Sequence, residues 1–140
     1  MRPLFASLVL AAAALAACSP ALTTPLDQIP KLTKLDDVMD NQSTVADPQF
    51  AKIGQATYAD ADYAAFTGVS ERIQITSVKI EDFAGEFAKG KEAEFKDVAK
   101  KLGEKAKALG AAAAAKDAPA SSNALKELKA TCKECHSKFR

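Results

Sequence analysis

Five residues near the C-terminus combine two thiols with an imidazole: Cys132-Lys133-Glu134-Cys135-His136. They include two of the three cysteines in the chain and its only histidine. The C-x-x-C-H pattern is that of a covalent c-type haem attachment site, where each thiol forms a thioether with a haem vinyl group and the adjacent imidazole ligates the iron. We therefore predict one haem c, bound covalently by Cys132 and Cys135, with His136 as the proximal iron ligand.

The motif has three other interpretations. A C-x-x-C pair can be a redox dithiol, but that use needs a βαβ context, and the sequence has no strand pattern. A structural zinc site normally has four ligands, whereas the motif supplies three. The third interpretation is a chance match, and the protein would then be a haem-free structural lipoprotein.

The N-terminus has the pattern of an export signal over residues 1–17. Arg2 supplies a positive charge, and the apolar run that follows is shorter than the about 20 residues that span a bilayer. Leu15-Ala16-Ala17-Cys18 resembles the lipobox of bacterial lipoproteins, in which the cysteine is lipidated. Ordinary signal cleavage after Ala16 is the alternative, and it would give a soluble periplasmic protein.

Cys18 favours the lipidated form for a second reason. With Cys132 and Cys135 bound to haem, Cys18 has no disulfide partner within the chain. Several acyl chains on one cysteine would hold the protein stably on a membrane. In lipoproteins of this kind, a residue other than Asp after the cysteine permits outer-membrane sorting, and Ser19 follows here. We expect residues 18–30, which contain three prolines, to be a tether.

The rest of the chain, residues 31–140, predicts four helices. Apolar side chains recur at steps of three and four over residues 32–53, 60–89, 91–115 and 117–139. The first helix is expected to be interrupted at residues 41–47 and to restart with Asp47 as N-cap and Pro48 at the first helical position. Gly90 is expected to stop the second helix, and Asp117, two residues before Pro119, is expected to cap the start of the fourth. These patterns predict an all-α, antiparallel four-helix bundle.

The last predicted helix carries the motif on its apolar side. Both motif cysteines belong to a seam with alternating steps of three and four, so they take core positions, and His136 lies beside them. Cofactor sites in helix bundles are built in the core from facing helices, and we expect the haem there, near the C-terminal helix. The seam consists of Leu125, Leu128, Cys132, Cys135 and Phe139.

Overall charge excludes one large class of proteins. The 19 basic and 18 acidic residues give a formal net charge of +1, without the basic excess typical of nucleic-acid binding. Away from the motif, no arrangement of acid, base and nucleophile suggests catalysis. We expect neither an enzyme nor a nucleic-acid-binding protein.

Together, the export signal, the four helices and a C-terminal C-x-x-C-H resemble the class II c-type cytochromes, the cytochrome c′ family. The resemblance is most specific over residues 131–140, where Phe139 and Arg140 follow the histidine by three and four positions. It implies a periplasmic four-helix bundle with one covalent haem c, redox partner proteins, and Arg140 near the proximal face of the haem. Members often dimerise, so the resemblance leaves a homodimer open.

The family divides by what faces the iron opposite the histidine. Low-spin members, which carry electrons, have a methionine of the first helix there, and Met39 stands at that place as the only methionine besides Met1. A soft thioether raises the potential of haem iron, and we expect Met39 to be the distal ligand. The alternative is that Met39 only fills the core, and that an open iron binds NO or another small gas. In one departure from the family, Leu35 replaces an arginine that often pairs with a haem propionate.

Overall fold

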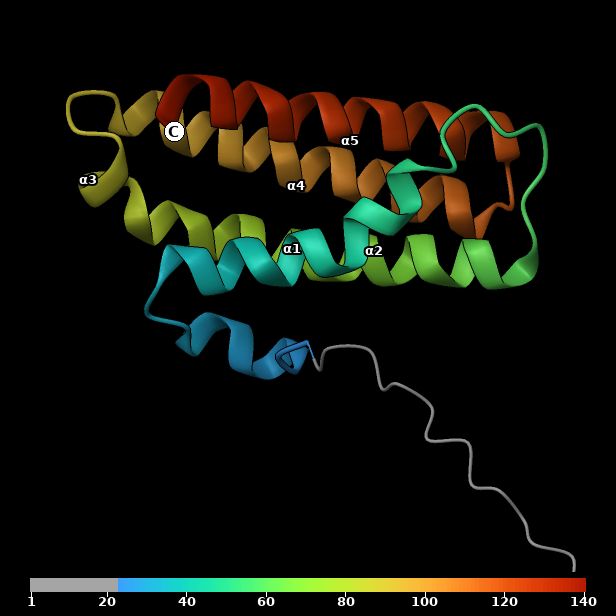
Figure 1. Ribbon diagram of the computed structural model, residues 1–140, viewed down its shortest axis with the longest axis horizontal. Coiled ribbons are helices and arrows are strands. Elements are labelled where there is room, and N and C mark those ends of the chain that lie inside the picture. Colours follow the sequence, from blue (N-terminus) through green and yellow to red (C-terminus); the bar gives the residue numbers. More distant parts are fainter. Residues whose placement is uncertain (1–22) are drawn as a thin grey trace, which may run out of the picture.

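The computed structural model describes residues 23–140, which form helices and no strand. Figure 1 shows the four long helices side by side, with successive helices running in opposite directions. This arrangement confirms the predicted all-α, antiparallel four-helix bundle. In chain order the elements are η1 (Leu26–Lys31), α1 (Leu35–Phe50), α2 (Asp60–Ile80), η2 (Glu81–Phe83), α3 (Ala84–Phe87), α4 (Glu92–Ala114) and α5 (Ala118–Phe139).

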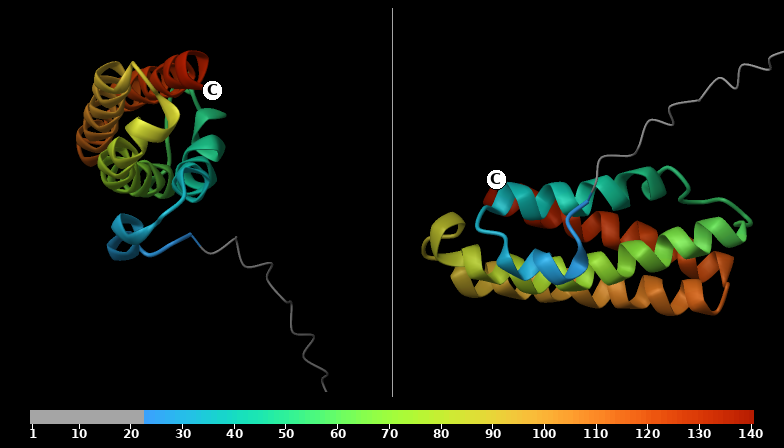
Figure 2. Two further views of the ribbon diagram at one scale, coloured as in Figure 1. Left: turned by 90° about the vertical axis from the view of Figure 1, so that its left-hand side faces the viewer. Right: turned by 90° about the horizontal axis from the view of Figure 1, so that it is seen from below.

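The four long helices are not packed equally. Helix α2 packs extensively against α4, α4 against α5, and α1 against α2, whereas α1 and α5 make few contacts. The end-on view in Figure 2 shows the four helices arranged as a ring. The side of the bundle between α1 and α5 is therefore its least tightly closed side.

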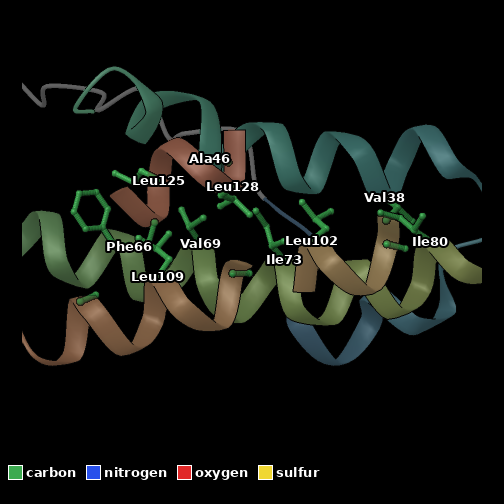
Figure 3. Packing of buried hydrophobic residues seen from close by; sticks show 14 of the residues in the cluster. Val38, Ala46, Phe66, Val69, Ile73, Ile80, Leu102, Leu109, Leu125 and Leu128 are labelled. Atoms are coloured by element: carbon green, nitrogen blue, oxygen red, sulfur yellow. The ribbon is translucent and has the colours of Figure 1, made fainter. Parts of the chain in front are cut away.

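Apolar stripes of the four helices meet in one continuous core. Large side chains in it are fully buried, and each contributes about 1.5–3 kcal/mol when removed from water. Figure 3 shows how they interdigitate along the bundle axis. The fully buried members include Val38, Phe66, Ile73, Leu109, Leu125 and Leu128.

Helix α1 is continuous, so the predicted interruption at residues 41–47 is wrong. Its two buried polar residues have partners: the Gln42 amide donates to Thr76 Oγ1 (2.8 Å), and the Asn41 amide donates to the carbonyl of Asp37 (2.8 Å). Because their hydrogen bonds are satisfied inside the packed bundle, these residues do not break the helix. Pro48 lies in the last turn of α1 and does not begin a new helix.

Packed structure also begins earlier in the chain than residue 31. Ile29 is fully buried, and the Arg72 guanidinium donates to the carbonyl of Thr24 (2.6 Å) and to Asn41 Oδ1 (2.7 Å). Residues 24–30, expected to be part of a tether, are therefore held against α1 and α2. Residues 1–17 and Cys18, with the predicted signal and lipidation site, lie outside the described residues.

Between α2 and α4, the chain departs from the predicted single helix over residues 60–89. Helix α2 ends at Ile80, and the short helices η2 and α3 follow. The prediction that Gly90 stops the second helix is therefore wrong; Gly90 instead lies in the turn between α3 and α4, with a φ of 81° in the left-handed region that glycine adopts without strain. Figure 2 shows α3 lying across the end of the ring of helices.

A helix cap and an ion pair with α4 position α5, the helix that carries the motif. Its predicted N-cap is confirmed, because Asp117 Oδ1 accepts a hydrogen bond from the amide of Ala120 (2.9 Å). Within the motif, Glu134 accepts from Lys101 of α4 (2.6 Å), which directs this side chain toward α4. The pKa of Glu134 is lowered, chiefly by hydrogen bonds from Lys101 and Lys138. The flanking cysteines are therefore presented beside the opening between α5 and α1.

Candidate haem-binding site

A cavity of about 680 Å³ lies between α1 and α5, at the end of the bundle where α5 finishes. Its volume is within the about 300–1,000 Å³ of typical ligand pockets. All four long helices and α3 contribute to its wall. The apolar and motif residues of the wall are Leu35, Met39, Ala46 and Phe50 of α1, Ile73 and Ile80 of α2, Phe87 of α3, Phe95, Val98, Ala99 and Leu102 of α4, and Cys132, Cys135, His136 and Phe139 of α5; Arg140, just after α5, also lines it.

Both motif cysteines line this cavity as partly buried thiols that are not joined in a disulfide. Burial, with smaller contributions from Cys135 and Asp47, raises the pKa of Cys132 to about 11. Burial likewise raises the pKa of Cys135. Both thiols are therefore neutral near pH 7, whereas cysteines of redox dithiols are activated by a lowered pKa. The site lacks the electrostatics of a thioredoxin-type centre.

His136, the residue after Cys135, also lines the cavity. Its side chain is exposed, and it lines the cavity near the C-terminal end of α5. The seam pattern placed it beside the cysteines, and the structure adds that it stands at the rim of the cavity rather than deep in the core. An imidazole at this rim can reach a group held in the cavity by the two cysteines.

Met39 lines the cavity from α1, on the other side from the motif in α5. It is half-buried in α1, packs against the hydrophobic core and lines the cavity that also contains His136. The structure thus brings a thioether and an imidazole, distant in sequence, to facing helices around one space. Leu35, one turn before Met39, lines the same cavity.

Charged residues are distributed unevenly around the cavity. Helix α1 contributes Asp36, Asp40 and Asp47 to the cavity lining, whereas Arg140 lines it at the end of α5. Among the described residues that line the cavity, Arg140 is the one with a permanent positive charge. Its exposed side chain is therefore the cavity-lining group suited to pair with a carboxylate of a bound ligand.

Aromatic residues complete the wall, and no specific role was predicted for them. Phe95 and Phe139 stack edge to face with ring centroids 5.1 Å apart, which fixes the end of α5 against α4. Phe50 and Phe87 line the cavity from α1 and α3. The sequence signal for Phe50, Phe95 and Phe139 was their place on apolar helix faces, but that signal does not separate core positions from cavity positions.

These residues fit a covalently bound haem. The cavity has a largely apolar wall, two thiols spaced for the two vinyl groups, an imidazole next to them and a thioether on the facing helix. Soft sulfur and imidazole donors are those that haem iron takes as axial ligands in c-type cytochromes.

Comparison with known proteins gives one match. The family model described as Cytochrome C' matches residues 34–140, from just before α1 to the C-terminus. No curated protein and no solved structure matches the chain. The matched range includes every residue that lines the cavity.

Proposed function

The chain belongs to the cytochrome c′ family and is a c-type cytochrome with one covalently attached haem c, and we propose that it carries electrons with an iron ligated by His136 and Met39. One observation carries this proposal: both side chains line the same cavity, from helices on its two sides. Cys132 and Cys135 would hold the haem through thioether bonds, and Arg140 would pair with a propionate. The haem would supply the one-electron ferrous–ferric couple.

The protein's own residues determine how that couple behaves. A thioether ligand from Met39 favours the ferrous form and raises the potential. The apolar wall, including Leu102 and Ile73, limits the water around the haem, which further favours the less charged state. The protein is thus an electron carrier rather than an enzyme, with other redox proteins as its partners.

A second candidate function follows from Leu35. Leu35 and Met39 both line the cavity one turn apart, so if Met39 only packs in the wall, this side of the cavity would offer the iron apolar side chains and no thioether ligand. The iron would then have an open position suited to NO or another small gas. The two functions differ in whether Met39 would ligate the iron.

We also propose that the protein works in the periplasm, attached to the outer membrane through a lipid on Cys18. The lipobox-like sequence before Cys18 and the family support this location. Among residues 23–140, no helix has both the length and the apolar character needed to cross a membrane.

Optical and magnetic spectra of the haem-loaded ferric protein test the axial ligand, with Met39→Ala and Leu35→Ala compared as variants. We expect a low-spin parent, a high-spin Met39→Ala variant with a lower reduction potential, and a Leu35→Ala variant that stays low-spin. A high-spin parent that takes up CO readily when reduced, together with an unchanged Met39→Ala spectrum, would favour the gas-binding function.

A further inference from the structure

Phe87 is a large apolar side chain that is both exposed and part of the cavity wall. It is one of two large hydrophobic side chains exposed among residues 23–140, with 43% of its surface accessible, and it lines the haem cavity. The other, Val78, is 68% exposed and does not line this cavity. Single exposed apolar residues are common, so exposure alone indicates nothing; the position of Phe87 in the cavity wall distinguishes it.

The segment that presents Phe87 is anchored on both sides. Phe83, Ala84 and Ala88 are buried in the core, and the amide of Ala88 donates to the carbonyl of Ala84 (3.0 Å). Gly90, with φ of 81°, then turns the chain into α4. Figure 2 shows α3 crossing the end of the bundle. Phe87 is therefore held at the end of the cavity by a short helix whose neighbouring residues are packed in the core.

We propose that Phe87 closes this end of the haem pocket and restricts the access of water and small ligands to the haem. The inference rests on the proposed function in one respect, namely that the haem occupies this cavity. Part of the exposed surface of Phe87 faces the cavity and would be covered by the haem. Because an apolar shell controls solvent access and local dielectric, this ring raises the reduction potential and slows the entry of external ligands.

The test compares Phe87→Ala, Phe87→Leu and the matched control Val78→Ala in the full haem-loaded chain. Two quantities are measured: the midpoint potential and the rate at which imidazole binds the ferric iron. We expect Phe87→Ala to lower the potential and to speed imidazole binding severalfold. Phe87→Leu should shift both in the same direction by less, and Val78→Ala should match the parent.

The inference is overturned if Phe87→Ala and Val78→Ala both match the parent in potential and in imidazole binding. If Phe87→Ala does not fold, the Phe87→Leu variant decides by the same criteria. A parent without covalent haem in the pyridine haemochrome assay overturns this inference and the proposed function together. A high-spin parent overturns only the electron-carrier assignment, and CO binding to the ferrous iron then replaces imidazole in the same comparison.

Discussion

Cys132 shows how position, rather than reactivity, suits a residue to its proposed role. Burial raises the pKa of its thiol to about 11, so the group is a poor nucleophile near neutral pH. Cys132 does, however, line the cavity wall together with Cys135 and His136. Haem attachment at this site would thus depend on a haem held against two correctly spaced thiols.

Replacing both cysteines, Cys132→Ala with Cys135→Ala, should abolish covalent haem and destabilise the bundle. The haem would occupy the cavity between α1 and α5, and without thioethers its contribution to packing would be weakened. Each kcal/mol lost should lower Tm by about 4 °C for a domain of this size. Haem staining of denaturing gels and thermal unfolding measure the two effects. Cys18→Ser is the control that keeps the haem, and an unchanged Tm in the double variant would contradict the prediction.

At the scale of the elements, two glycines explain how closely α2 and α4 approach. Each lowers the intrinsic stability of α4 by about 1 kcal/mol relative to alanine. In the structure, Gly103 faces Ser77 and Gly110 faces Ser70 of α2. A Cβ at Gly110 would lie 2.5 Å from Ser70 Oγ and 3.1 Å from Ser70 Cβ, closer than normal packing allows. The low helix propensity of these glycines is thus offset by the close packing of α2 and α4 that they allow.

Gly110→Ala should therefore destabilise the protein, by about 1–3 kcal/mol, because it overpacks the contact between α2 and α4. Gly68→Ala is the matched control, since Gly68 lies inside α2 and an added Cβ meets nothing within 4 Å. The control should stabilise the fold by up to about 1 kcal/mol through helix propensity. Urea unfolding measures both, and equal stabilisation by the two substitutions would show that the close contact does not matter.

For the whole molecule, the early start of packed structure affects how the proposed anchor would hold the bundle. The carbonyl of Thr24 accepts a hydrogen bond from Arg72, so the packed domain begins by this residue. Few residues separate Thr24 from Cys18 in the sequence. A short connection of this kind keeps a lipid-anchored domain close to its membrane, because each residue extends by at most about 3.6 Å. The haem would then act near that surface.

Cys18→Ser should move the protein from the membrane fraction to the soluble periplasmic fraction, because several acyl chains are needed for stable attachment. Cell fractionation followed by haem staining measures the distribution. Ser19→Ala, which keeps the cysteine, serves as the control and should remain with the membranes. A Cys18→Ser variant that still fractionates with membranes would refute the lipid anchor.

The sequence by itself determined what depends on neighbours along the chain. The C-x-x-C-H spacing identified the haem attachment motif, apolar periodicity predicted four helices, and the Asp117-Ala118-Pro119 sequence predicted the cap of the last one. These features follow from local geometry: helix turns repeat every 3.6 residues, and caps involve adjacent residues. The all-α fold class followed from the same local patterns.

Only the tertiary structure decided what depends on residues far apart in the chain. The continuity of α1 required Thr76 as a partner for Gln42, and the true start of packed structure required Arg72 as a partner for Thr24. The cavity exists because α1 and α5 stand apart while the other helices pack closely. Met39, His136 and Phe87 line one cavity for that reason. The packing of segments that are far apart in the chain cannot be predicted from the apolar periodicity of any single helix.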